Sequence, residues 1–181
     1  MKTAGGNRDH GGRQPPLLAD RVCQGVHILF VGINPGIRSA AIGHHFAGFS
    51  NRFWKLLWES GLVPERLGPE DDVRLPEWGF GITNLVPRAT PGIDTIAQEE
   101  YVAGLRVLRR KVRRWKPALV AFVGVSLYRF VASVKGPIAL GEQAERFEGA
   151  RVSVLPNPSG RNANFSYAEM LAAFASLRPR R

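Results

Sequence analysis

The chain of 181 residues contains a single cysteine, Cys23. One cysteine cannot form a disulfide within the chain, a zinc site of several thiolates or a cysteine-ligated iron–sulfur cluster. The adjacent residues His44 and His45 have no cysteine or carboxylate close in sequence to complete a ligand set, and neighbouring side chains usually point in different directions. The sequence therefore predicts no metal site.

Long apolar runs are also absent. No stretch approaches the roughly 18 unbroken apolar residues that span a bilayer. The N-terminal segment MKTAGGNRDHGGRQPP lacks the apolar core of a secretory signal. We therefore expect a cytoplasmic protein without a membrane partner.

Acidic residues are scarce, with 15 Asp and Glu against 25 Lys and Arg, which gives a formal net charge of +10 and a pI near 10.8. A positive surface attracts polyanions, so nucleic acid is the leading partner and an anionic membrane the lesser one. Segment 106–116 (RVLRRKVRRWK) concentrates these cations. It is either a platform for DNA phosphates or a solvated helix end with cations near the helix C-terminus.

The chain is long enough for one domain, and 44% hydrophobic residues supply a buried core. Residues 1–18 are rich in Gly, Arg and Pro with little apolar content, which predicts a mobile basic tail. Residues 19–178 are expected to form the folded domain.

Short apolar runs alternate with amphipathic segments along that domain. Strands are predicted at 26–32, 80–86, 118–124 and 151–156. Helices are predicted at 51–61, 96–116, 126–134 and 166–177, the last capped by Ser166. Strands that are apolar on both faces fit a parallel sheet covered by helices on each side. The fold class is therefore α/β, a three-layer α/β/α single domain with a central, mostly parallel sheet of four to five strands.

Two loops that follow predicted strands differ from ordinary connections. They are GINPG at 32–36 and PNPSG at 156–160. Asn, Pro and Gly are common turn formers, so each loop alone is explained as a rigid turn. In an open parallel sheet, however, ligands bind outside the carboxyl ends of the strands. Two such loops on one sheet therefore favour a functional site.

Three segments in order carry a family resemblance: GINPGIRSAAIGHHFAGFSNRFWKLLWESGL (32–62), GITNLVPRATPG (81–92) and LPNPSGRNANFS (155–166). Together they resemble the mismatch-specific uracil-DNA glycosylases and their thymine-DNA glycosylase relatives, over roughly residues 26–177. The resemblance implies a uracil-DNA glycosylase-like fold and excision of uracil or mispaired thymine from double-stranded DNA containing G·U or G·T mismatches. It implies no metal or organic cofactor. We expect a monomer associated with the nucleoid.

The resemblance places the catalytic asparagine of the family at Asn34. Glycosidic cleavage builds positive charge on the sugar and negative charge on the departing base, so it needs an oriented water and hydrogen-bond donors. An amide orients a water but does not take its proton strongly. The backbone N–H groups of Ile33 and Gly36 are expected to approach the carbonyl oxygens of the base, since glycine has no side chain in the way.

The resemblance also implies that Phe46 stacks on the extruded base, with core packing as the alternative. Asn84, at the end of the second strand, is expected to contact base or phosphate, whereas Asn51 fits a helix cap better. Asp94 lies where the family does not regularly carry a carboxylate. It is a candidate for the general base that Asn34 cannot be, or else an exposed loop acid or helix cap.

The loop NPSGRNANFS corresponds to the wedge of the family, which fills the gap left by a flipped nucleotide. Arg161 is the candidate for insertion, next to Gly160 and Asn162. Bacterial relatives usually carry a leucine here and thymine-DNA glycosylases an arginine, which can hydrogen-bond to the orphaned guanine. Asn157 is expected to contact the substrate and Ser159 the DNA backbone, and both to brace the loop.

Two other functions remain open at this point. One is a glycosylase of broader scope that acts on other damaged bases or on single strands. The other is a DNA-binding protein without catalysis. No lysine or N-terminal amine is placed for a Schiff base, so a glycosylase of this kind would leave an abasic site in an intact strand.

Overall fold

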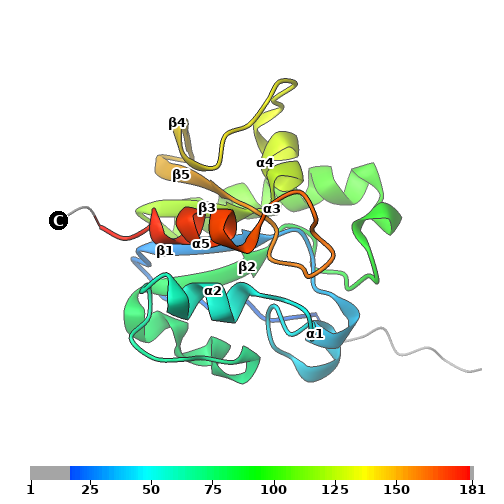
Figure 1. Cartoon of the computed structure of the whole chain (residues 1–181). Coiled ribbons are helices and arrows are strands. Elements are labelled where there is room, and N and C mark those ends of the chain that lie inside the picture. The colour runs from blue at the N-terminus through cyan, green and yellow to red at the C-terminus, as the bar shows by residue number, and fades with distance from the viewer. Residues whose placement is uncertain (1–16, 180–181) are drawn as a thin grey trace, which may run out of the picture.

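The computed structural model describes residues 17–179, and its centre is a five-stranded sheet of order β2-β1-β3-β5-β4 (Figure 1). The strands are β1 (Ile28–Gly32), β2 (Phe80–Asn84), β3 (Leu119–Val123), β4 (Gly141–Phe147) and β5 (Ala150–Leu155). All neighbouring pairs are parallel except β4 and β5, which are antiparallel. The α/β three-layer class with a mostly parallel sheet is therefore confirmed.

The four apolar runs all form strands, whereas β4 was not predicted. Its sequence GEQAERF is largely polar, and most of its residues are exposed. An antiparallel edge strand with solvent on both sides needs no apolar alternation, so the sequence gives no strand signal there.

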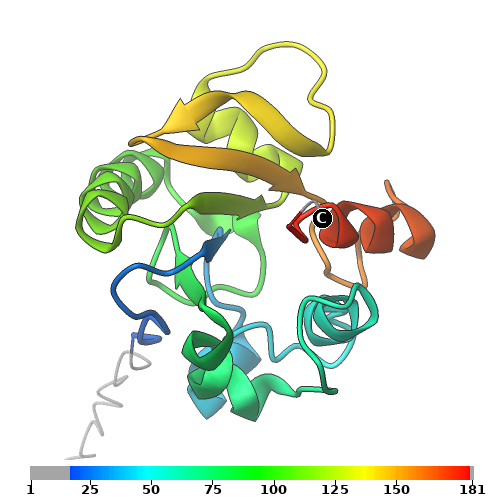
Figure 2. The ribbon, with the colours of Figure 1, turned by 90° about the vertical axis from the view of Figure 1, so that its left-hand side faces the viewer.

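Helices cover both faces of the sheet (Figure 2). Helices α2 (Phe53–Glu59) and α5 (Tyr167–Ala175) and the 3-10 helix η1 (Pro69–Trp78) lie on one face, and α3 (Gln98–Trp115) and α4 (Val125–Ala132) on the other. Successive strand residues point to opposite faces. Phe30 accordingly packs in the first layer and Leu29 in the second.

The four predicted helices are present, with α5 capped as expected by the Ser166 hydroxyl, which accepts from the Glu169 N–H at 3.2 Å. The sequence did not indicate η1 or α1 (Ile37–Ile42). A second, shorter 3-10 helix, η2 (Ile93–Thr95), lies in the loop between β2 and α3. Most of the predicted tail, residues 1–16, lies outside the described residues.

The carboxyl ends of the parallel strands meet at one edge of the sheet. The loop after β1 carries Asn34, β2 ends at Asn84, and the loop after β5 begins at Pro156. Helix α3 packs closely against the chain that leaves β2, since a Cβ on Gly104 would lie 2.3 Å from the Leu85 carbonyl oxygen. None of the helices among residues 17–179 has the length and apolar character needed to cross a bilayer.

Candidate active site

A cavity of about 430 Å³ opens at this edge of the sheet. Most of the residues that the sequence singled out lie along its wall: Ile33, Asn34, Gly36, Phe46, Asn84, Asn157, Ser159 and Arg161. Three separate loops therefore bring their polar groups to one volume, within the range of about 300–1,000 Å³ usual for ligand sites. Gly160 and Asn162 lie in the same loop as Arg161 and outside the wall.

The Asn34 side chain is held by hydrogen bonds from its amide nitrogen. Nδ2 donates to the Thr90 hydroxyl at 2.8 Å and to the Pro35 carbonyl at 3.0 Å. The Thr90 hydroxyl in turn donates to the Gly92 carbonyl at 2.6 Å, so it can only accept from Asn34. Among residues 17–179 no donor reaches Oδ1 of Asn34. The oxygen of the amide is therefore the atom left to bind a water.

Asn84 occupies space that a side chain at position 32 would take. A Cβ on Gly32 would lie 2.6 Å from Oδ1 of Asn84, closer than real Cβ contacts. The first glycine of GINPG therefore makes room for the Asn84 amide rather than only permitting a turn. Phe46 also approaches this point, with Cζ 3.6 Å from the same position.

His45 fixes the orientation of the Asn84 amide. The residue is 1% exposed, and burial lowers its pKa, an effect that the Ala19 carbonyl and Asp72 partly offset. Nε2 lies 3.0 Å from the Ala19 carbonyl, which can only accept, so Nε2 carries the proton. Nδ1 of the neutral ring is then an acceptor for Nδ2 of Asn84 at 3.4 Å. Oδ1 of Asn84 consequently points away from His45.

Protonation of His45 is expected to lower the stability of the protein. Its folded-state pKa lies below the usual 6.5 because of burial, so the unfolded chain takes up the proton at a higher pH. The free energy of unfolding should therefore fall as pH decreases from about 6.5 to the folded-state pKa. Tm measured between pH 8 and 5 should show this decline, and His45→Gln should lose it. An identical pH slope in the variant would contradict this account.

The Phe46 ring has a core contact and a cavity contact. It stacks on Phe53, with ring centroids 4.1 Å apart and planes at 14°, and it lines the cavity. Phe53 is fully buried and belongs to the core layer of α2. Core packing and stacking on a base are thus compatible for Phe46, because its ring packs on Phe53 and also lines the cavity.

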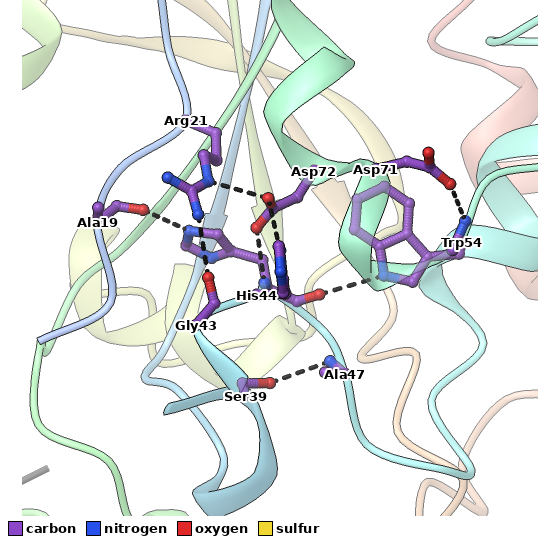
Figure 3. A network of polar contacts seen from close by, with 11 residues as sticks. Ala19, Arg21, Ser39, Gly43, His44, Ala47, Trp54, Asp71 and Asp72 are labelled. Carbon is purple, nitrogen blue, oxygen red and sulfur yellow. Dashed lines mark hydrogen bonds and ion pairs between the residues drawn. The ribbon is translucent and has the colours of Figure 1, made fainter. Parts of the chain in front are cut away.

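Asp72 anchors the segment that begins at His44 and continues through His45 to Phe46, and Figure 3 shows its carboxylate between Arg21 and His44. This carboxylate has no exposed surface. It accepts from Arg21 Nε at 2.9 Å and from the His45 backbone N–H at 2.9 Å, and it lies 3.0 Å from His44 Nδ1. The adjacent histidines therefore contact a carboxylate distant in sequence. In the described part of the chain, no group of three or more His, Cys, Asp or Glu is placed to hold a metal.

The loop at 157–166, which the resemblance assigns as the wedge and which is called the wedge loop below, is braced by its own polar side chains. Oδ1 of Asn157 accepts from the Ser159 N–H at 3.0 Å, and Nδ2 of Asn162 donates to the Asn157 carbonyl at 2.8 Å. The Arg161 N–H lies 3.3 Å from the Ser159 hydroxyl oxygen. Its side chain is exposed at the cavity mouth. The hydrogen bonds within the loop thus fix the backbone that carries the exposed Arg161 side chain.

Asn51 and Asp94 differ in how they relate to the cavity. Oδ1 of Asn51 accepts from the Phe53 N–H at 2.9 Å, so Asn51 braces the turn that leads into α2, whose N-cap is Arg52. Asp94 is exposed in η2, and its neighbour Ile93 lines the cavity whereas Asp94 itself does not. This position does not support Asp94 as the general base.

The C-terminal end of the basic segment of α3 lies away from the cavity. The carbonyl of Trp115, at the end of α3, accepts from the Gly25 N–H, which precedes β1. This end of α3 is therefore at the opposite edge of the sheet from the carboxyl ends of the strands. A phosphate platform for DNA bound at the cavity is not favoured there.

Part of that basic segment stabilises the fold. Arg109 and Arg113 both donate to Glu148, and Lys111 lies 2.8 Å from the Asp20 carboxylate. These contacts tie α3 to the β4–β5 turn and to the chain before β1. At least three cations of the segment therefore form ion pairs that stabilise the fold.

Comparison with known proteins identifies the family. The family model "Uracil DNA glycosylase superfamily" matches residues 19–178. The chain belongs to the uracil DNA glycosylase superfamily. Membership implies a DNA glycosylase, a hydrolase that separates a base from its deoxyribose. The sheet is also similar to the solution NMR structure of a candidate uracil DNA glycosylase from Methanosarcina acetivorans, at 21% identity and a TM-score of 0.60, covering 91% of this chain and 99% of that one.

Sequence reasoning missed several residues around the candidate site. Thr90, which orients Asn34, lies 56 residues away in sequence. Asp72 lies in a helix that the sequence did not indicate, and His45 was considered only as a metal ligand. A signal existed for His45, because it lies within the same motif as Phe46. Thr90 also lies within a quoted segment, 81–92, but nothing in the sequence pairs it with Asn34, and Asp72 has no local signal.

Proposed function

We propose that this protein is a monofunctional, mismatch-specific uracil-DNA glycosylase. It removes uracil, and mispaired thymine, from G·U and G·T mismatches in double-stranded DNA, by base flipping and hydrolysis of the N-glycosidic bond. The observation that carries the proposal is the Asn34 amide, whose nitrogen is engaged by Thr90 and Pro35 while its oxygen remains for a water at the cavity. Among residues 17–179, no carboxylate belongs to the wall of this cavity.

The chemistry follows from that arrangement. The bond between base and sugar breaks with its electron pair on the base, which departs as an anion, while the water oxygen bonds to C1′ and the water releases a proton. Oδ1 of Asn34 accepts a hydrogen bond from this water and fixes its position. It does not remove the proton strongly, so the enzyme depends on positioning and on a good leaving group. Backbone N–H groups of Ile33 and Gly36 are proposed to stabilise the departing anion.

Asn84 is proposed to select the base. His45 turns Nδ2 of Asn84 toward itself, which leaves Oδ1 as an acceptor in the cavity wall. Uracil and thymine present an N3–H donor, whereas N3 of cytosine is an acceptor. An acceptor fixed at Asn84 favours the first two, because a site whose buried polar group is left unpaired rejects the wrong partner.

Excision tests the proposal directly. Purified protein is incubated with oligonucleotides that contain one uracil, either opposite guanine in a duplex or in a single strand. The expected products are free uracil and an alkali-labile abasic site in an otherwise intact strand. Equal rates on duplex and single strand would favour the glycosylase of broader scope. DNA binding without any base release would favour the non-catalytic alternative.

Arg161→Ala is expected to lower uracil excision from a G·U duplex about tenfold and to change excision from a single strand by less than about twofold. Flipping a base out of a duplex costs a few kcal/mol, and the wedge offsets this cost only where a base stack exists. Single-turnover rates on the two substrates provide the measurement. An unaltered duplex rate would remove Arg161 from the wedge role.

Asp94→Asn is expected to keep the excision rate within about threefold of the wild-type rate, since the carboxylate is exposed outside the cavity wall. A general base contributes about 10²–10⁴-fold, so its loss would be obvious in single-turnover kinetics. A rate reduced a hundredfold or more would assign the base to Asp94 after all and would imply movement of its loop.

A further inference from the structure

Phe49 is the most exposed large apolar residue in the described part of the chain, at 90%. Single exposed apolar residues are normal on protein surfaces. This one differs because it lies at the mouth of the cavity that contains Asn34. Exposure of an aromatic ring to water is unfavourable, and at this cavity the ring lies where a planar base could stack on it.

The ring is held in place rather than left free. The Arg38 guanidinium carbon lies 3.9 Å from the centroid of the Phe49 ring. Arg38 is itself fixed, because its Nε donates to the Ala47 carbonyl at 2.8 Å. A cation over a ring face is an attractive contact even at exposed sites. The ring is thus supported on one face and open to solvent elsewhere.

The Phe49 segment touches the wedge loop. A Cβ on Gly160 would lie 2.5 Å from the Ser50 Cβ, so the two backbones meet where only glycine fits. Phe49 precedes Ser50 and Arg161 follows Gly160, so each side chain is one residue from the contact. Both line the cavity. The Phe49 ring and the Arg161 side chain therefore come from neighbouring parts of the backbone and lie at the same cavity.

We infer that Phe49 is a second wedge, which stacks on a base of the duplex next to the extruded nucleotide. This inference rests on the proposed function. The ring offers apolar stacking to any base, and Arg161 offers charge and hydrogen bonds, so the two act on one gap in different ways. DNA is the occupant rather than a protein partner, because Arg38 contacts the ring, Arg161 lines the same cavity and the chain carries a net charge of +10.

The experiment measures base unstacking without chemistry. The full chain carrying Asn34→Ala is mixed with a G·U duplex that has 2-aminopurine beside the uracil, whose fluorescence rises when it is unstacked. Adding Phe49→Ala is expected to reduce this fluorescence change at least fivefold and to weaken duplex binding about tenfold. Phe49→Trp should restore both values, since tryptophan also stacks.

Val73→Ala is the matched control, because Val73 is an exposed apolar residue in η1, outside the cavity wall. It should leave fluorescence and affinity unchanged, and Tm should show that all variants are folded. Phe49→Ala behaving like Val73→Ala would overturn the inference. The readout does not require uracil release. If Phe49 unstacks the duplex but the native protein releases no base in the excision assay, the proposed function alone is refuted.

Discussion

Asn34→Ala is expected to lower the single-turnover rate of uracil release from a G·U duplex about a thousandfold, while the affinity for the same duplex changes less than about threefold. The variant removes the amide oxygen that is proposed to orient the attacking water, and it leaves the loop that carries Arg161 unchanged. Orientation of a reactant contributes large rate factors, and even a misplacement of about 1 Å can cost about 10²-fold. Quench-flow or manual sampling at saturating enzyme provides the rate, and fluorescence anisotropy provides the affinity.

Thr90→Val tests whether the Asn34 amide must be held in place, because this variant keeps the amide but removes the hydroxyl that it donates to. Valine is similar in shape to threonine but cannot accept from Nδ2 of Asn34, a contact of 2.8 Å in the native protein. We expect about a tenfold lower rate, between those of the native protein and Asn34→Ala, because the amide is present but less well fixed. A rate for Asn34→Ala equal to that of the native protein would exclude Asn34 from the reaction.

Asp72→Ala is expected to lower the free energy of unfolding by about 3 kcal/mol, in the range for breaking a buried pair by removing one partner. The change leaves Arg21 and the buried His45 N–H without their acceptor. For a chain of this size the corresponding fall in Tm is about 6–12 °C. Urea unfolding with a constant m-value is the measurement.

Asp71→Ala is the matched control, one residue away on the same 3-10 helix. Asp71 is only half-buried and accepts from the Gly68 N–H at 2.8 Å, so its loss should cost about 1 kcal/mol. If both substitutions lower the free energy of unfolding equally, the buried contacts of Asp72 contribute no more to stability than the partly exposed contact of Asp71. Because Asp72 holds the segment with His45 and Phe46, its loss should also slow excision at temperatures where the variant is still folded.

The central layer of the fold could be predicted because its strands are buried on both faces. Runs such as 26–32 and 118–124 must be continuously apolar for that reason, and they became β1 and β3. The edge strand β4 and the 3-10 helix η1 have no such requirement. Their conformations depend on pairing with β5 and on contacts such as Asp72 with Arg21, which join segments far apart in sequence.

The site could be predicted in part for a similar reason. A loop that follows a parallel strand is brought to the crevice by topology alone, which placed Asn34, Asn84 and Asn157 together. The orientation of each amide could not be predicted, because it is set by Thr90 and His45 through tertiary contacts. Asp94 shows the limit of this reasoning, since proximity in sequence to the cavity did not bring its side chain to the wall.

The measurement that tests the central claim most directly is the single-turnover rate of uracil release by the purified protein from a G·U duplex, compared with an A·U duplex of the same sequence. The account predicts release from G·U at least about tenfold faster, because a wobble pair is easier to open and Arg161 can contact the orphaned guanine. Equal rates would contradict mismatch specificity. No release from either duplex would contradict the proposed glycosylase.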